Sequence, residues 1–409
     1  MRGEVRLGTL LAGIEVGVAG GTQAKAPADG EWGVLRLSAM SSGRFTAEQA
    51  KRLASQTAPP ERLEVHDGDV LAVRVNGAQH LVGAAQVVRG AAPQLLLSDL
   101  MFRLVPAEGR LLPGFLGLLL NSLDARRQIR MSMRGSSGQF QLPQSSVKAL
   151  RVPDVSLEEQ RRIVAAHAAF ERRITGLERV LSKLAEAETA VVATAMAAAP
   201  GRVQLGTWIE RIEAGKSPLA VDAPAGDGEW GVLKVSAVQP GWFKAAENKV
   251  IRDPALINPL YEVRSGDLLM TRANTEALVG LACIARTPPP RLMLSDKTLR
   301  LIPDETFADS EFMELALLSP DVRTQVKARA TGTSGSMKNI SQVAVQQLLV
   351  PDVPKEQQRL VVETVRASRK RTEAMRQQVA KLRHVQQGMV EDLLAGRVRV
   401  PEMTSAGAA

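Results

Sequence analysis

Several short strings contain the residue types of known catalytic sites, but their spacing does not fit the chemistry. The string GKS at 215–217 resembles the end of a phosphate-binding loop, yet position 210 holds Glu where that loop needs its first glycine. Pro218 would also break the helix that must follow. The string INPLY at 257–261 resembles the NPPY of amino-methyltransferases, but it lacks the second proline and a glycine-rich cofactor loop upstream. The sequence therefore predicts neither kind of site.

Nucleases, metalloenzymes and thiol enzymes fit equally poorly. Pro153–Asp154 and Pro351–Asp352 each open a helix rather than a strand, and no suitably placed E-x-K string follows. The single cysteine, Cys283, lies in the apolar run LVGLACIA, where a core position is expected. One cysteine also excludes an intrachain disulfide and a multi-cysteine metal site. The histidines are scattered, which argues against a metal site or a catalytic triad; they are His66, His80, His167 and His384.

Polar residues in glycine-rich loops are better candidates for function. Such loops let backbone N–H groups approach a phosphate, and Arg or Lys supplies the counter-charge. In a major groove, Asn and Gln can pair with adenine and Arg with guanine. The candidate DNA-binding residues are Arg74, Asn76, Arg134, Gln139, Lys216, Arg272, Asn274, Thr333, Ser334, Lys338 and Asn339. Taken singly, each of them also fits an ordinary surface turn.

Length and composition limit the class of protein. The chain has 409 residues, which suggests two or three domains at roughly 150 residues each. A net charge of +9 is compatible with binding to nucleic acid, whereas an aromatic content of 3% argues against a protein that stacks single-stranded bases. No apolar run reaches the ~18 residues of a membrane span, and the N-terminus does not fit a signal peptide. We therefore expect a soluble cytoplasmic protein.

An internal repeat of about 198 residues determines which elements hold these loops. GEWGVLRLSAM at 30–40 returns as GEWGVLKVSAV at 228–238. Further matches in the same order are 5–8 with 203–206, 68–76 with 266–274, 95–99 with 292–296, and 151–164 with 349–361. The chain is therefore a tandem duplication, and its repeat is too long for a solenoid. GRVRVP at 396–401 repeats the GRVQLG that opens the second copy at 201–206, which indicates a cyclically closed arrangement.

Each copy divides into a globular part and a long helix. Residues 1–153 and 200–351 carry short apolar stretches of period two between Gly, Pro and Asp, which predicts mixed domains with several strands. Residues 154–199 and 352–397 lack turn signals and place apolar residues every seven positions, and 398–409 is a tail. The expected fold class is α+β: two tandem-duplicated mixed α/β target domains separated by two long helices that pair as an antiparallel coiled coil.

The predicted seam of this coiled coil runs through both helices. Its residues are Ile163, Phe170, Ile174, Leu177, Leu181, Leu184, Val361, Val365, Met375, Val379, Leu382 and Met389. Ser156 and Glu159 have the spacing of a capping box, and Pro354 suits a first helical position. At 1.5 Å per residue, ~40 residues would make a rod of about 60 Å. The alternative is two amphipathic helices that each pack on their own domain.

Three strings of the second copy make the chain resemble the DNA-specificity (S) subunits of Type I restriction–modification systems. They are GDLLMTRANT at 266–275, GTSGSMKNIS at 332–341 and VPDVPKEQQRLVV at 350–362. Together with the duplication, the resemblance covers essentially the whole chain. It implies a non-catalytic subunit in which each globular domain is a target-recognition domain for one half of a bipartite double-stranded DNA site. The paired helices would then fix the gap between the half-sites.

The resemblance also implies partners in a defence system against foreign DNA. Two methyltransferase (M) subunits would use S-adenosylmethionine to methylate adenine, and restriction (R) subunits would use ATP and Mg. This chain itself would bind no metal or cofactor. The first copy departs from the pattern, since GSSGQFQLP stands where the second has GTSGSMKNIS. Its DNA contacts should differ accordingly, which suggests two unlike half-sites.

Two other classes of function remain as alternatives. One is a protein-interaction scaffold with two ligand-binding domains on a coiled coil and no DNA. The other is a single-chain enzyme that both cleaves and modifies, which the absence of a cofactor loop from the sequence disfavours. A scaffold would show no salt-dependent binding to duplex DNA, so that measurement separates it from a DNA-specificity subunit.

Overall fold

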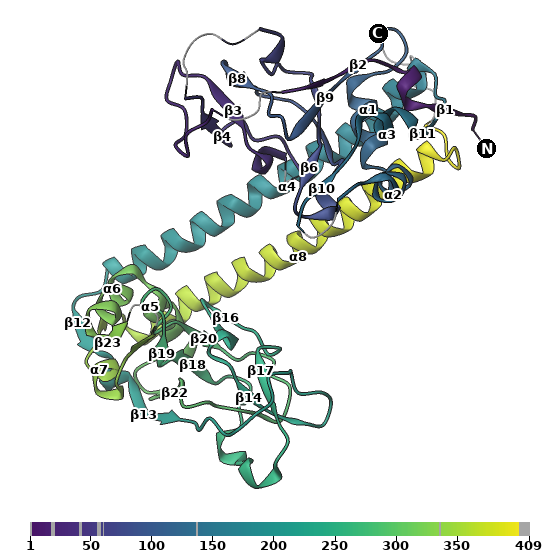
Figure 1. Ribbon diagram of the computed structural model, residues 1–409. Helices are drawn as coiled ribbons and strands as arrows, with labels where there is room; N and C mark the ends of the chain where they lie inside the picture. Colours follow the sequence, from purple (N-terminus) through teal and green to yellow (C-terminus); the bar gives the residue numbers. More distant parts are fainter. Residues whose placement is uncertain are drawn as a thin grey trace, which may run out of the picture. The chain divides into compact units, whose positions relative to one another are not determined.

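The computed structural model describes residues 2–17, 21–40, 43–54, 59, 61–135, 138–334 and 337–400. The side chains of Thr333 and Ser334 and residues 401–409 of the predicted tail lie outside this description. The chain divides into two compact units, which Figure 1 shows coloured along the sequence. Unit 1 consists of residues 1–178 and 377–409, and unit 2 of residues 179–376.

Unit 1 combines short strands and short helices. In chain order they are β1 Glu4–Arg6, β2 Leu11–Val16, β3 Gly33–Leu35, β4 Ala50–Arg52, β5 Val70–Val73, β6 Val75–Asn76, β7 Ala85–Val87, β8 Leu95–Leu96, β9 Met101–Pro106, α1 Pro113–Asn121, α2 Leu123–Ser132, β10 Phe140–Gln141, α3 Gln144–Ala149 and β11 Arg151–Pro153. A four-stranded antiparallel sheet has the order β2-β9-β5-β7, and a smaller sheet has the order β4-β3-β8. Two further pairs, β1 with β11 and β6 with β10, are antiparallel.

Unit 2 repeats this arrangement. Its elements are β12 Arg202–Gln204, β13 Ile209–Ala214, β14 Trp230–Leu233, β15 Val238–Gln239, β16 Trp242–Phe243, β17 Asn248–Ile251, β18 Leu268–Thr271, β19 Ala273–Asn274, β20 Ala282–Ile284, β21 Leu292–Met293, β22 Thr298–Pro303, α5 Ser310–Leu318, α6 Pro320–Arg329, β23 Thr331–Ser334, β24 Met337–Asn339, α7 Gln342–Gln346 and β25 Leu349–Pro351. The main sheet is β13-β22-β18-β20, the second is β17-β14-β21, and β12 pairs with β25. A third sheet, β19-β24-β23, contains the candidate residues Asn274, Lys338 and Asn339.

The two units share a topology because they share an apolar pattern. The central strands β5 and β18 are continuous apolar or small-residue runs, VLAV and LLMT, and every residue in them is buried. This is the pattern of strands that are covered on both faces. Phe115 on α1 and Phe312 on α5 stand at equivalent positions, and each is buried in the core of its own unit. The predicted fold class, a duplicated α+β domain, is confirmed.

Each main sheet also contains a buried arginine that is paired with carboxylates from neighbouring segments. On β9, Arg103 lies 3.0 Å from a carboxylate oxygen of Glu15 and 3.0 Å from one of Asp69. On β22 the equivalent residue is Arg300, whose partners are Glu213 and Asp267. A buried charge is tolerated only when it is paired. The paired arginine therefore fixes the loop that leads into the central strand in both units.

Two long helices complete the chain: α4 spans Leu157–Ala197 and α8 spans Lys355–Leu394. The Ser156 hydroxyl accepts a hydrogen bond from the Glu159 N–H at 3.3 Å, as expected for an N-cap. Along each helix, buried and half-buried residues recur at alternating intervals of three and four. This is the heptad spacing of a coiled-coil seam.

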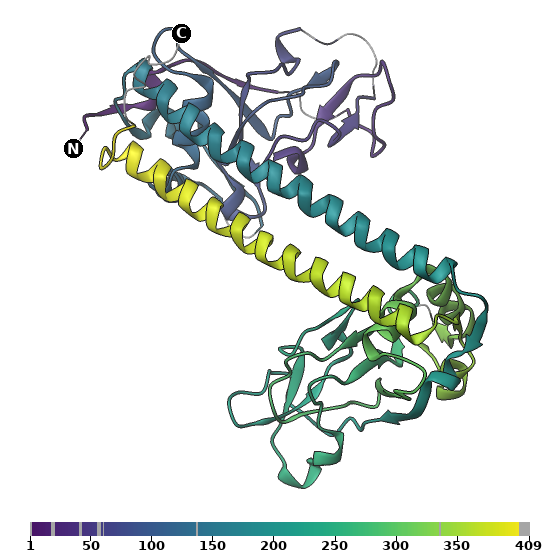
Figure 2. The ribbon, with the colours of Figure 1, turned by 180° about the vertical axis from the view of Figure 1, so that it is seen from behind.

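The two helices lie side by side and antiparallel within each unit, as Figures 1 and 2 show. In unit 1, Glu171 accepts a hydrogen bond from Gln386 at 2.8 Å, and Glu178 forms an ion pair with Arg383. In unit 2, Glu188 pairs with Arg369 at 2.9 Å. Every predicted seam residue is buried or half-buried. The predicted antiparallel pairing of the long helices is confirmed.

A buried glutamine joins each long helix to its globular domain. Gln160, one turn into α4, accepts from the Leu112 N–H at 2.9 Å, and its amide group donates to two backbone carbonyls. Gln358 does the same on α8, with the Asp309 N–H at 3.0 Å. Both side chains are almost wholly buried, with 2% and 0% exposure respectively. The start of each helix is therefore held by hydrogen bonds that water cannot replace.

The seam predicts a large difference between two substitutions on α8. Leu382→Asp places a charge on the half-buried seam, whereas Gln378→Asp places one on the exposed face. We expect the first to lower the free energy of unfolding by about 2–4 kcal/mol and the second by less than about 0.5 kcal/mol. Denaturant unfolding followed by circular dichroism measures both. Equal effects would contradict the paired-helix arrangement.

Candidate nucleic-acid interface

In unit 2, a small sheet brings together candidate residues that lie more than fifty positions apart in sequence. Strand β19 pairs with β24 in a register that sets Ala273 opposite Asn339 and Asn274 opposite Lys338. The Ile340 N–H also donates to the Arg272 carbonyl at 2.9 Å. Strand β23, which holds the backbone of the predicted Thr333 and Ser334, lies on the other side of β24. The two candidate loops of unit 2 therefore form one surface.

The close approach of strand β23 to β24 depends on a glycine within β23. Gly332 has φ +141°, and a Cβ atom there would lie 2.4 Å from the carbonyl oxygen of Met337. In unit 1, Gly135 has φ +117°, and a Cβ would lie 2.2 Å from the Gln139 carbonyl oxygen. Any other residue would have to move the backbone at these points. Both copies therefore require glycine at this position, although the residues after it differ.

The side chains of this surface in unit 2 differ in their freedom to reach a ligand. The Lys338 ammonium donates to the Gly332 carbonyl at 2.9 Å, and the Asn274 side chain accepts from the next N–H along the chain. Asn339 is exposed. Residue Arg272 is half-buried, and no hydrogen bond or ion pair of its guanidinium group occurs among the described residues. Arg272 and Asn339 are thus the members best able to contact an added partner.

Lys216 lies in a loop that is tied to the same region. The hydroxyl of Ser217 bonds to the carboxylate of Asp296, and the carbonyl of the next residue, Lys297, accepts from the Arg272 N–H at 2.8 Å. Lys216 itself is exposed. The structure therefore connects the loop of Lys216 to the Arg272 loop through two hydrogen-bonded residues.

Unit 1 has the corresponding arrangement in shorter form. Strand β6 pairs with β10, with Asn76 opposite Phe140, and the Leu142 N–H donates to the Arg74 carbonyl at 2.9 Å. Arg134 forms an isolated bridge with Gln141. The exposed candidates on this surface are Arg134 and Gln139. Residues 136 and 137 of the loop between them lie outside the described residues.

Arg74 and Asn76 make internal contacts instead of pointing free. The guanidinium of Arg74 donates to the Asp99 carbonyl at 3.0 Å, and its carbon centre lies 5.8 Å from the centre of the Phe102 ring. The Asn76 side chain accepts from the Ala78 N–H at 2.9 Å, which closes a local turn. In this structure both side chains shape the loop of unit 1, whereas Arg134 and Gln139 are left exposed on it.

The single cysteine and the possible metal-ligating side chains can also be located in the described part of the chain. Cys283 is buried on β20, and burial, followed by the negative charge of Glu314, raises the pKa of its thiol to about 12. A thiol with that pKa is not a nucleophile at neutral pH. Among the described residues, His, Cys, Asp and Glu side chains do not gather into a group of metal ligands. The described helices include none that is long and apolar enough to cross a membrane.

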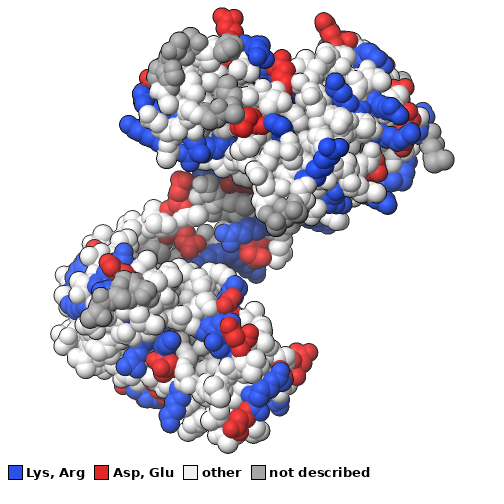
Figure 3. All heavy atoms as spheres, in the orientation of Figure 1, with Lys and Arg blue, Asp and Glu red and all other residues white. Residues whose placement is uncertain are grey.

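Charged side chains of both signs lie on the surface of both units. Figure 3 shows Lys and Arg interspersed with Asp and Glu on the visible face. The excess of nine positive charges is thus not gathered into a single block on that face. On this face the positive side chains are scattered and do not form one broad basic patch.

Comparison with known proteins gives this geometry a context. The chain is 36% identical over 142 residues to the Type I restriction enzyme EcoEI specificity subunit of Escherichia coli, a match that covers 34% of this chain and 24% of that relative. No protein-family model matches. Two solved structures match almost the whole chain. The S subunit of a Type I restriction–modification system from M. genitalium has a TM-score of 0.53 at 12% identity, covering 98% of this chain and 96% of its own.

The second structure comes from work on complex assembly and conformational transition of the type I R-M system. It has a TM-score of 0.58 at 19% identity and covers 97% of this chain and 98% of its own. The chain has the fold of a Type I specificity subunit. The resemblance predicted from the sequence strings is confirmed, in fold over the whole chain and in sequence over about a third of it.

Within this specificity-subunit fold, one pair of structural residues was missed by the sequence reasoning. Arg323 on α6 donates to the carbonyls of Val279 and Ala277, at 2.6 and 2.9 Å. Arg126 on α2 does the same to Val82 and His80. Each arginine holds the turn that follows the candidate Arg–x–Asn string of its unit. The available signal was that both copies carry arginine at the same repeat position.

The differing environments of Arg74 and Arg272 predict different effects on stability. Arg74→Ala removes a hydrogen bond and a contact with the Phe102 ring, and we expect it to lower the free energy of unfolding by about 1–2 kcal/mol. Arg272→Ala, at the equivalent position in unit 2, should change it by less than about 0.5 kcal/mol. Denaturant unfolding of the full chain gives both values. A larger loss with Arg272→Ala would assign that side chain to structure.

Proposed function

We propose that this chain is the DNA-specificity subunit of a Type I restriction–modification system, and that it reads a bipartite duplex target. Residues 1–153 and 200–351 are the two target-recognition domains, and the paired helices at 154–199 and 352–397 set the gap between the half-sites. One observation carries the proposal. In each copy of a specificity-subunit fold, polar and basic side chains come together on a loop surface that requires a glycine.

The chemistry of these loops suits a duplex. Lys338, Lys216 and Arg134 would contact phosphates, which position the protein without reading sequence. Arg272, Asn339 and Gln139 have the side chains that pair with purine edges in a major groove. Because Phe140 lies opposite Asn76 in one unit where Lys338 lies opposite Asn274 in the other, the two half-sites should differ in sequence.

We further propose that the chain acts without catalysis of its own in the cytoplasm. It would dock two methyltransferase subunits, which use S-adenosylmethionine to methylate adenine, and restriction subunits, which use ATP and Mg. Two comparisons support this assignment. The chain is similar in sequence to a known specificity subunit, and its fold matches that of a structure from work on type I complex assembly. Purified alone, the chain should neither methylate nor cut DNA, and measured turnover would contradict the assignment.

Arg272→Ala and Lys338→Ala should weaken binding of the full chain, or of its complex with methyltransferase subunits, to target DNA. If Lys338 contacts a phosphate, its loss makes the slope of log K against log salt less steep by about one. It also weakens binding to all DNA sequences alike. If Arg272 pairs with a base, its loss should cost about 1–3 kcal/mol and relax specificity at one position.

The control is Arg211→Ala, which removes an exposed cation whose charge Glu210 and Glu213 already offset. It should leave DNA affinity unchanged. Fluorescence anisotropy over a salt series measures all three variants. Salt-independent affinity, or no binding to any duplex, would favour the protein scaffold without DNA.

A further inference from the structure

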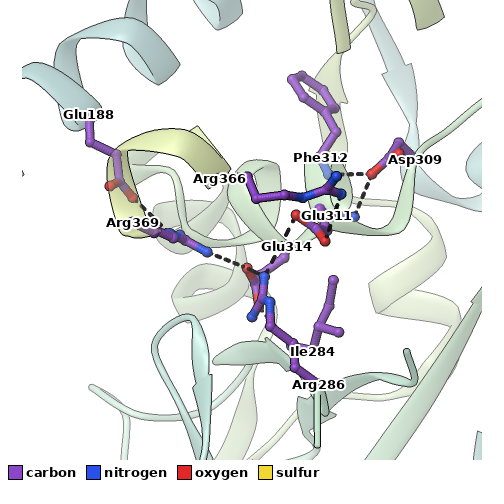
Figure 4. A network of polar contacts seen from close by, with 9 residues as sticks. All are labelled: Glu188, Ile284, Arg286, Asp309, Glu311, Phe312, Glu314, Arg366 and Arg369. Atoms are coloured by element: carbon purple, nitrogen blue, oxygen red, sulfur yellow. Dashed lines mark hydrogen bonds and ion pairs between the residues drawn. The ribbon is translucent and has the colours of Figure 1, made fainter. Parts of the chain in front are cut away.

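A buried carboxylate in unit 2 joins the globular domain to its long helices. The side chain of Glu314, on α5, has no exposed surface. Its oxygens accept from the Ile284 N–H at 2.7 Å, from the Arg286 guanidinium at 3.1 Å and from the Arg369 guanidinium at 3.0 Å. Figure 4 shows these partners converging on the one carboxylate. They come from strand β20, from the residues just after it, and from helix α8.

The network continues through Arg369 to the other long helix. Its Nε atom donates to Glu188 on α4 at 2.9 Å, while its Nη1 atom donates to Glu314. A second, more exposed bridge lies beside the first: Glu311 on α5 pairs with Arg366 on α8 at 3.1 Å. A single arginine thus holds α4, α5 and α8 together within unit 2.

The physical cost of this arrangement indicates what it does. A carboxylate without solvent contact is expensive to bury, and an apolar side chain of similar volume would often be at least as stabilising. Two donors from the domain, Ile284 and Arg286, however, hold the carboxylate in place, and the third donor, Arg369, restricts where α8 can lie against α5. The network is thus suited to specifying the geometry of α5 on α8.

Unit 1 joins its domain to the helices by a different means. The position equivalent to Glu314 is Gly117, where a Cβ would lie 3.2 Å from Val87. One turn earlier on α1, a Cβ on Gly114 would lie 3.0 Å from Val164 of α4. Arg369 likewise corresponds to Glu171. In unit 1, close apolar packing at glycines therefore stands at the position of the buried carboxylate. The ion pairs between domain and helix are made instead by Arg44 with Glu171 and Glu178 of α4, and these side chains are more exposed than Glu314.

We propose that Glu314 is a positioning residue that sets the angle of the second target-recognition domain on its helix pair, and that it thereby restricts the permitted gap between half-sites. This inference rests on the function proposed above. The hydrogen-bond partners of Glu314 are Ile284, Arg286 and Arg369, none of which is a candidate DNA-binding residue, so it acts through Arg369 and the helices. Without its charge, the domain remains folded but samples several orientations on α8. Half-site spacing is set by such geometry.

The test compares Glu314→Gln with Glu311→Gln, the same change one turn earlier on α5 in the more exposed bridge. Each variant is assembled with methyltransferase subunits and given DNA targets that share both half-sites but differ by one or two base pairs in the gap. The wild type and Glu311→Gln should methylate only the native gap. For Glu314→Gln, the ratio of methylation at the native gap to that at the neighbouring gaps should fall at least about tenfold.

A second variant covers the case in which Glu314→Gln does not fold. Arg369→Gln leaves Glu314 paired with Arg286 and Ile284 but cuts its link to the helices, and it should give the same broadened gap profile. Lower thermal stability with an unchanged gap ratio in both variants would overturn the inference and make the network merely structural. A wild-type complex that methylates no split target would instead remove the proposed function, and this inference with it.

Discussion

The paired helices are the constraint on which the rest of the structure depends. Each long helix carries one apolar stripe over about forty residues, and a stripe of that length cannot be left in water. The stripes cover each other in antiparallel order, with Glu171 meeting Gln386 and Glu188 meeting Arg369. Gln160 and Gln358 are buried against the adjoining domains and donate to their backbone carbonyls. These hydrogen bonds fix where each long helix starts relative to its own domain.

The duplication reuses the same local devices in both units. Arg103 and Arg300 pair with carboxylates in the main sheets, and Gln128 and Gln325 each bond both backbone groups of a residue in the strand that precedes a long helix. The short pairs β1–β11 and β12–β25 have the same register. The units diverge at exposed loop residues and at the attachment of domain to helix. Divergence there fits two domains that share a scaffold but recognise different sequences.

The sequence was informative where structure follows from local periodicity. Heptad spacing, period-two strands and the repeat were enough for the fold class and the helix pairing, since two equivalent apolar stripes in one chain can cover each other. The same repeat matched the loop of Arg74 in the first copy with that of Arg272 in the second, and residues 133–143 with residues 330–341. The pairing of the Arg272 and Lys338 loops in one sheet was an additional fact, because antiparallel register between β19 and β24 has no local signature.

The individual side chains were harder to assign because their partners are remote. Nothing near Arg74 in sequence reveals that it bonds the Asp99 carbonyl and lies over Phe102. Glu314 looks like a surface residue in a short helix, yet its partners at 286 and 369 bury it completely. The short helices α2 and α6 bury few side chains, Ala125 and Ile129 in the first and Val322 and Val326 in the second, so period alone does not reveal them. Burial of a polar residue is a property of tertiary contact, and a single sequence does not encode it locally.

The most direct test is modified-base sequencing of DNA from cells that express this chain together with a methyltransferase subunit of its own system. The account predicts one adenine-methylated motif in two unlike parts separated by a fixed gap. Methylation of an undivided motif would contradict the assignment of one half-site to each domain. No methylation, with both proteins folded and co-purifying, would contradict DNA recognition itself.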